Sequence, residues 1–125
     1  MLLELAHIAL NAGRIDEGEV RARKALMLAD QMRDRGGRVF GIGLLARVAA
    51  ERGHRERAGR LWGAVENENV GAPLGGWRRH SQRCAEQIRH AASTEFDRGY
   101  AEGRSLRLDD AVALALTGAD PPRLM

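Results

Sequence analysis

Residues 5–18 read LAHIALNAGRIDEG, and this stretch decides the fold. It predicts the end of one helix, a tight turn at Gly13-Arg14 and the start of a second helix, because glycine accepts the backbone conformation that follows a last helical turn. The pattern returns with Gly53 in place of Gly13, an offset of 40 residues. Further matched pairs are Leu5 and Leu45, Ala6 and Ala46, Ile8 and Val48, Ala9 and Ala49, Gly18 and Ala58, and Ala25 and Val65. An internal repeat of this length indicates stacked structural repeats.

Apolar residues recur at helical spacing through both repeats. They predict helices over about 2–12, 16–35, 38–52 and 55–69. Leu5 and Met32 are among the side chains expected to face inward. The helix at 38–52 is apolar on most sides, so we expect it to be the central element. Gly36-Gly37 should break the chain between the repeats.

A second region follows the loop signal at 71–76. Helices are expected over about 77–92, over a short segment that ends at Gly103, and over about 108–117. The inward stripe of the first of these consists of Trp77, Ser81, Cys84 and Ile88. Trp62 should be buried between this C-terminal cap and the second repeat.

Composition supports a cytoplasmic globular helical protein. Hydrophobic residues make up 44% of the chain and aromatic residues only 4%, which disfavours a β-sandwich. The net charge is +3, but acidic residues alternate with arginines, as on a solvated surface. Cys84 is the only cysteine, so an internal disulfide is excluded. No apolar run approaches the ~18 residues of a membrane span, and we expect no membrane partner.

The repeat resembles the tetratricopeptide family. In the first copy the matching residues are Leu5, Ala6, Ala9, Gly13, Ile15, Gly18, Ala22, Ala25 and Leu26, and in the second they are Leu45, Ala46, Ala49, Gly53, Ala58, Trp62 and Val65. Arg55 departs from the pattern, because the family usually has an apolar or aromatic residue there. The period also exceeds the usual 34 residues, so the helices should be longer than in the standard repeat.

Two further segments resemble the C-terminal helical-repeat region of large bacterial regulators. One is residues 57–64, RAGRLWGA, together with Gly71-Ala72-Pro73, and the other runs from Phe96 to Leu116. In that family the repeats follow a signalling NTPase module, and the chain carries a LuxR-type DNA-binding domain or another output domain. Neither module is present in these 125 residues, so neither activity is carried over. The opening inside an uncapped amphipathic helix suggests a segment of a longer chain. Arg107 departs from the family, which tends to place a Ser or Thr cap there.

The predicted fold is therefore all-α: stacked antiparallel helical hairpins in a tetratricopeptide-like α-solenoid, with a C-terminal helical cap and about seven helices. We assign one domain, residues 1–125. It comprises repeat 1 (1–35), repeat 2 (38–70), the cap (77–118) and a tail (119–125).

No constellation predicts catalysis, a cofactor or a metal. Residues 41–46, GIGLLA, have the outline of a dinucleotide fingerprint but lack the strand that it needs, and close helix packing explains them better. Lys24 is the only lysine and does not belong to a phosphate loop. The four histidines never fall at the i, i+4 spacing of a zinc pair. Cys84 is interpreted as a buried structural thiol.

The tetratricopeptide resemblance implies a partner-binding concave face, lined by the first helix of each hairpin. The first hairpin contributes Leu3, His7, Leu10 and Asn11, and the second contributes Phe40, Gly43, Arg47, Ala50 and Glu51. Such a wall suits a protein or peptide with both apolar and charged groups. The upstream part of the same chain is an equally good occupant.

The leading hypothesis is a non-enzymatic protein–protein interaction or sensor module, belonging to the C-terminal repeats of a bacterial transcriptional regulator. One alternative is a nucleic-acid contact through the basic helix at 77–92, with Arg78, Arg79, Arg83 and Arg89 beside Trp77. We expect this less, because no groove-reading motif is present. The other alternative is a structural cap that keeps neighbouring repeats soluble. The oligomeric state stays open.

Overall fold

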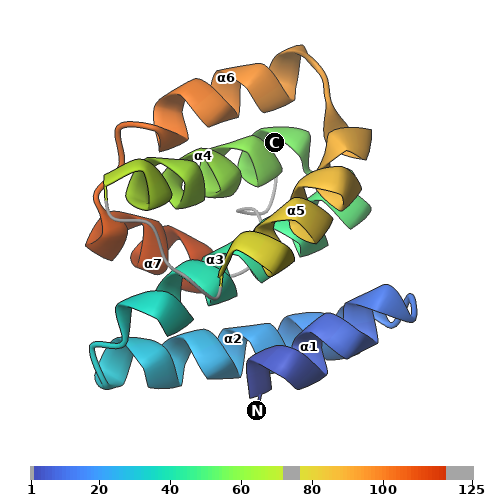
Figure 1. Cartoon of the computed structure of the whole chain (residues 1–125). Coiled ribbons are helices and arrows are strands. Elements are labelled where there is room, and N and C mark those ends of the chain that lie inside the picture. The colour runs from blue at the N-terminus through green and yellow to red at the C-terminus, as the bar shows by residue number, and fades with distance from the viewer. Residues whose placement is uncertain (1, 72–76, 118–125) are drawn as a thin grey trace.

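The described part of the chain, residues 2–71 and 77–117, is all-helical and contains no strand in the computed structural model (Figure 1). Its helices are α1 (Leu2–Asn11), α2 (Ile15–Gln31), α3 (Arg35–Glu51), α4 (Arg55–Gly71), α5 (Trp77–Ile88), the 3-10 helix η1 (Arg89–Ala91), α6 (Thr94–Gly103) and α7 (Leu108–Leu116). The all-α class and the seven α-helices expected from the sequence are confirmed. Within the helix expected at 77–92, the last turn is the 3-10 helix η1.

The turns inside the two hairpins have the same geometry. Gly13 and Gly53 adopt φ values of 82° and 79°, in the left-handed region that glycine occupies without steric cost. The next residue then donates its backbone N–H to a carbonyl five positions earlier. Arg14 donates to Ala9 and His54 donates to Ala49, both at 2.9 Å. Residues 40 positions apart in the sequence thus form turns with the same backbone geometry.

The connection between the hairpins differs from the sequence prediction. Gly36 and Gly37 do not break the chain but lie in the first turn of α3. Asp34 caps this helix, since its carboxylate accepts a hydrogen bond from the backbone N–H of Gly37 at 3.1 Å. A Cβ atom at Gly37 would lie only 2.9 Å from the Ala29 side chain. The glycine therefore serves close packing of α3 on α2, and the expected break was wrong.

The chain turns instead at Arg33, whose φ of 55° is left-handed. Asp34 donates its backbone N–H to the Ala29 carbonyl at 2.9 Å, as Arg14 and His54 do in the hairpin turns. Because α2 ends at Gln31, Met32 is exposed rather than inward-facing, which corrects the sequence prediction.

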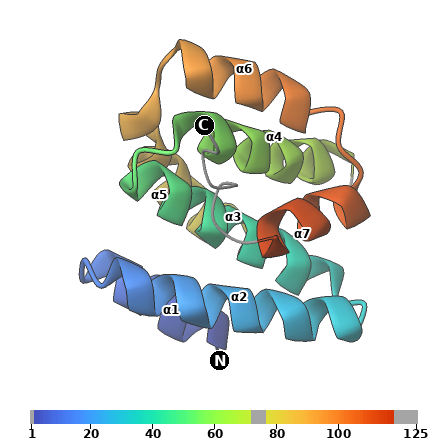
Figure 2. The same ribbon diagram turned by 180° about the vertical axis from the view of Figure 1, so that it is seen from behind.

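Helix α3 lies at the centre of the molecule (Figures 1 and 2). It packs against α2, α4, α5 and α7, and also touches α1. Its side chains are buried on nearly every side, including Val39, Ile42, Leu44 and Leu45. The expected central element is therefore confirmed. Helix α2 packs on both α1 and α3, so the hairpins lie side by side. Extension of this arrangement into a longer solenoid stays a prediction.

Four glycines bring α4 and α6 into backbone contact. Gly59 and Gly63 lie one turn apart on α4, and Gly99 and Gly103 have the same spacing on α6. A Cβ atom added at any of them would overlap a backbone carbonyl oxygen of the opposite helix. At this separation Cα–H groups can contact those carbonyls directly. Figure 1 shows α6 lying along α4 at the edge of the molecule farthest from α1 and α2.

Trp62 is buried, as expected from the sequence. It lies on α4 beside Ile88 of α5 and Phe96 of α6, with all three side chains lining one cavity. Because the indole fills the junction between the second hairpin and the C-terminal helices, it links these two parts of the core.

We expect Gly103→Ala to destabilise the fold by about 3 kcal/mol, near the upper end of overpacking effects. The added methyl group overlaps the Arg60 carbonyl, and a helix backbone yields less readily than a side chain. Thermal unfolding followed by circular dichroism measures the effect, with an expected drop of roughly 10 °C.

Gly36→Ala is the matched control. Its added Cβ meets nothing closer than the Asp34 carboxylate at 3.7 Å, which is ordinary contact. We expect its stability to stay within about 0.5 kcal/mol of the original chain. Equal losses for both variants would contradict a specific role for the α4–α6 glycines.

Candidate functional site

The nine residues of the predicted partner face differ in how far they are buried, in part because α5 packs on α3. Leu3, His7, Phe40 and Ala50 are half-buried, Asn11 and Glu51 are exposed, and Leu10, Gly43 and Arg47 are buried. The structure brings His7 and Phe40 together edge to face, with ring centroids 6.5 Å apart. The three buried residues are enclosed by the chain's own helices and present no side chain to an external partner. For the other six, partner binding stays a prediction.

Arg47 is a charged side chain inside the interface between α3 and α5. It is 2% exposed, and its Nε and Nη1 atoms find no hydrogen-bond acceptor among the described residues. Loss of hydration lowers the pKa of its guanidinium, and the negative charges that Cys84 and Glu51 can carry offset this only in part. Buried donors without acceptors typically cost ~1–3 kcal/mol. Arg47 therefore opposes the stability of the isolated chain.

Cys84 faces the same interface from α5 and is fully buried. Burial raises the pKa of its thiol from 9.0 to about 11, although Arg47 and Arg83 pull the pKa downward. The nucleophilic form of cysteine is the thiolate, which is scarce here at neutral pH. This environment fits the buried structural thiol expected from the sequence.

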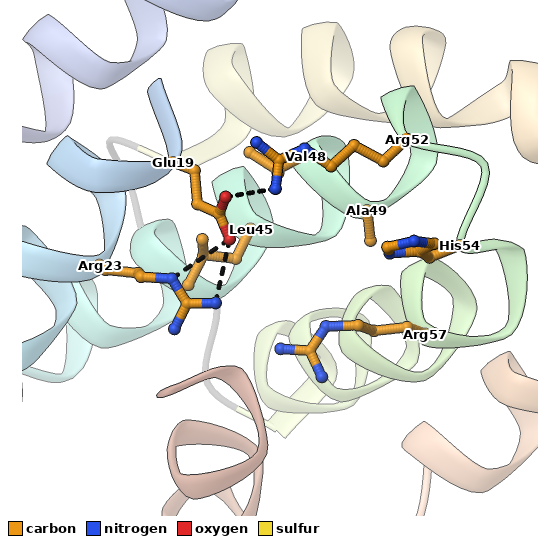
Figure 3. A pocket seen from close by; sticks show the side chains of 8 residues that line it. All are labelled: Glu19, Arg23, Leu45, Val48, Ala49, Arg52, His54 and Arg57. Carbon is orange, nitrogen blue, oxygen red and sulfur yellow. Dashed lines mark hydrogen bonds and ion pairs between the residues drawn. The ribbon is translucent and has the colours of Figure 1, made fainter. Parts of the chain in front are cut away.

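A small basic pocket lies where α2, α3 and α4 meet (Figure 3). It is lined by Glu19, Arg23, Leu45, Val48, Ala49, Arg52, His54 and Arg57. Glu19 lies between Arg23 and Arg52 and accepts hydrogen bonds from both. Burial opposes the charge on Glu19, but these arginines outweigh it and lower the pKa of the carboxyl group.

Two arginines of this pocket hold the end of α7. Arg23 donates to the Leu116 carbonyl at 3.3 Å, and Arg57 donates to the Leu114 and Ala115 carbonyls at 3.2 and 3.3 Å. Cations favour the C-terminus of a helix, where carbonyls lack intrahelical donors. The pocket has room of only about 20 Å³, enough for one water molecule. Its role is structural.

A larger pocket, about 350 Å³ in volume and open to solvent, lies between α4, α5 with η1, and α6. We call it the aromatic cavity, and its lining is Trp62, Glu66, Ala85, Ile88, Arg89, Ala92, Phe96, Asp97 and Tyr100. The volume falls in the range of small-ligand sites. The sequence pattern did not predict this site, because its residues come from separate helices that meet only in the folded chain. The available signal was the presence of Phe96 and Tyr100, four residues apart, in a chain with few aromatics.

The Tyr100 hydroxyl group takes part in a series of hydrogen bonds that fixes its position. Tyr100 donates its hydroxyl hydrogen to Glu66, and Arg104 donates to the Tyr100 oxygen at 3.3 Å. Burial, and then the hydrogen bond to Glu66, raise the pKa of Tyr100. The Phe96 ring stacks on that of Tyr100, with centroids 6.3 Å apart. Side chains on α4 and α6 thus give the cavity a fixed wall.

The first hairpin carries an apolar outer surface. Among described residues, the large hydrophobic side chains that are exposed all lie on α1, α2 or the residue after α2: Leu5, Ile8, Val20, Met27, Leu28 and Met32. Leu5 was expected to face inward but is 44% exposed, because Ala6, Ala9 and Leu10 form the buried side of α1 instead. Leu5 and Ile8 lie three residues apart on α1, so they are neighbours on one face of that helix.

The described residues contain no group of three or more His, Cys, Asp or Glu side chains placed to hold a metal ion. Across residues 2–71 and 77–117, no helix combines the length and the apolar character needed to cross a membrane. The stripe residues Trp77 and Ser81 have side chains outside the described set, as do Arg78 and Arg79 of the proposed nucleic-acid surface.

Replacing Arg47 with methionine should leave the chain equally stable or raise its free energy of unfolding by about 1–3 kcal/mol. An apolar side chain of similar length removes the unpaired donors and keeps the packing. Urea unfolding measures the difference. A loss above ~1 kcal/mol would show that Arg47 has an interaction that stabilises the fold.

Cys84 should resist alkylation by iodoacetamide at pH 8 in the folded chain and react when the chain is unfolded in urea. With a pKa near 11, only about one thiol in a thousand is ionised at pH 8, and the side chain is buried. The raised pKa also makes stability fall as the pH rises from 9 toward 11, because the unfolded thiol ionises first. A Cys84→Ala chain should lack this loss, and fast alkylation of the native protein would refute the assignment.

Comparison of the chain with protein families, with curated proteins and with solved structures found no match. Two features of the chain itself point to function: the exposed apolar side chains of the first hairpin and the aromatic cavity. Each is defined by residues and contacts of this chain alone.

Proposed function

We propose that this chain is a non-enzymatic interaction module that docks another helical hairpin on α1. We further propose that it acts in this way within a bacterial transcriptional regulator, as the resemblance of residues 57–64 and 96–116 implies. The partner is an amphipathic helical hairpin of the same repeat type, from the upstream part of the same protein or from a partner protein.

The internal repeat carries this proposal. At the 40-residue offset, Leu45 and Val48 of α3 are the counterparts of Leu5 and Ile8 of α1. Leu45 and Val48 are each 3% exposed, whereas Leu5 is 44% and Ile8 is 56% exposed. We attribute the difference to the preceding hairpin that packs against α3, since none of the described residues forms such a hairpin against α1.

The contacts of α3 indicate what α1 would contact. Leu45 and Val48 line the basic pocket together with Glu19 and Arg23 of α2, and a Cβ atom at Gly41 would lie 3.0 Å from the Leu26 side chain. The second helix of one hairpin therefore covers the first helix of the next. By the same geometry, the second helix of a docked hairpin would cover Leu5 and Ile8. Burying each side chain contributes about 1–2 kcal/mol.

Two rival functions stay open to test. A nucleic-acid contact through α5 draws support from the exposed Arg83 and Arg89, and it would show binding that weakens steeply with salt. However, the carboxylates of Glu66 and Asp97 share the aromatic cavity with Arg89 and disfavour phosphate beside it. A purely structural cap would dock a hairpin of its own chain but bind no separate partner.

A chain extended by one repeat tests the proposal. Residues 1–41 are placed ahead of residues 2–125, so that Leu2 follows Gly41 as Ile42 does in the original chain. The added hairpin should cover Leu5 and Ile8 of the following copy. We expect a higher melting temperature than for the original chain, because the added hairpin buries Leu5 and Ile8 of the following copy.

Ile8→Arg provides the control in both chains. In the original chain Ile8 faces solvent, so the substitution should change stability by less than about 0.5 kcal/mol. In the copy that follows the added hairpin, it should cost about 2–4 kcal/mol. Equal small effects in both chains, with no gain in melting temperature on extension, would contradict docking on α1.

A further inference from the structure

We propose that the aromatic cavity between α4, α5 and α6 binds a small organic cation with an apolar body, such as a primary amine on an aromatic or branched aliphatic group. This site is independent of the docking surface on α1. Binding at this site would allow a small molecule to regulate the interaction module.

The cavity concentrates the chain's scarce aromatic side chains. Trp62, Phe96 and Tyr100 line it, and the whole sequence contains only two Trp, two Phe and one Tyr. The aliphatic side chains of Ala85, Ile88 and Ala92 complete the apolar wall. Aromatic faces attract cations through the ring quadrupole, at solvent-exposed sites as well as at buried ones. Arg104 already uses this attraction, with its guanidinium carbon 5.8 Å from the centre of the Tyr100 ring.

The position of the carboxylates favours a cation over an anion. Glu66 and Asp97 are acidic and Arg89 is basic, and Arg104 beside the Tyr100 ring balances the remaining negative charge, so the preference rests on the carboxylate of Glu66 and not on net charge. Glu66 comes from α4 and is half-buried, and its carboxylate is oriented by the hydrogen bond from Tyr100. A carboxylate has about four acceptor positions, so Glu66 can accept a further hydrogen bond from an ammonium group.

The lining also sets the size and shape of the ligand. A volume near 350 Å³ accommodates a single aromatic ring with a short chain. The apolar wall would take the body of the ligand, and Glu66 would take the ammonium group. A phosphate or carboxylate ligand would face Glu66 and Asp97 with the same sign of charge, which disfavours binding.

Three probes of nearly equal shape test the charge preference: benzylammonium, benzyl alcohol and benzoate. Amide shifts in a ¹⁵N–¹H spectrum of the whole chain report both the affinity and the place of binding. We expect saturable shifts for residues of α4, α5 and α6 around the cavity. Benzylammonium should bind at least tenfold more tightly than benzyl alcohol, and benzoate should bind more weakly than both.

Glu66→Gln keeps the shape of the side chain and removes its charge. It should weaken benzylammonium binding about tenfold and change benzyl alcohol binding less than twofold. Glu86→Gln is the matched control, because Glu86 is an exposed carboxylate of α5 that does not line the cavity, and its affinities should stay within twofold. If Glu66→Gln fails to fold, Asp97→Asn on the exposed side of α6 replaces it, with an expected loss of about threefold.

Equal affinity for benzylammonium and benzyl alcohol would overturn the proposal, and so would shifts that map away from the cavity. Absence of saturable binding for all three probes would overturn it as well. None of these outcomes bears on docking at α1, since Leu5 and Ile8 lie outside the cavity.

Discussion

The backbone contact between α4 and α6 is the constraint on which the C-terminal half depends. Four glycines let the two helices approach until the carbonyls of one face the Cα atoms of the other. Arg60 of α4 supports the contact from outside by donating to the Glu102 carboxylate at 2.7 Å. Because α6 packs on α4, the side chains of Phe96 and Tyr100 line the aromatic cavity. The chain then continues from α6 into α7.

The sequence predicted the elements whose cause is local. Gly13 and Gly53 mark hairpin turns because the backbone at those turns is left-handed, and the apolar character of α3 marks a central helix. The predicted chain break at Gly36-Gly37 was wrong, because these glycines lie inside α3, where Gly37 allows close packing. The turn lies at Arg33, which adopts a left-handed conformation just before Asp34 caps α3. The spacing of apolar residues does not distinguish a glycine in a left-handed turn from a glycine at a close helix contact.

The candidate sites were harder to predict, because they depend on which neighbours are present. Arg47 was expected on an open face, but α5 returns over α3 and encloses it. Leu5 was expected to be buried, yet it is 44% exposed, because Ala6, Ala9 and Leu10 form the buried side of α1. The aromatic cavity needs Trp62, Arg89 and Phe96 together, and only tertiary packing of α4, η1 and α6 brings them there.

The hydrogen bonds from Arg23 and Arg57 to the last turn of α7 affect how cooperatively the molecule unfolds. In an open array of repeats each hairpin contacts only its neighbours, so terminal units can peel away one at a time. Here Arg23 of α2 and Arg57 of α4 both hold the last turn of α7, which joins the first hairpin, the second hairpin and the C-terminal helix in one ring of contacts. Separating α2 from the rest of the molecule, or detaching α7, must break these shared contacts. Such closure favours all-or-none cooperativity over stepwise melting, in the manner of a small globular domain.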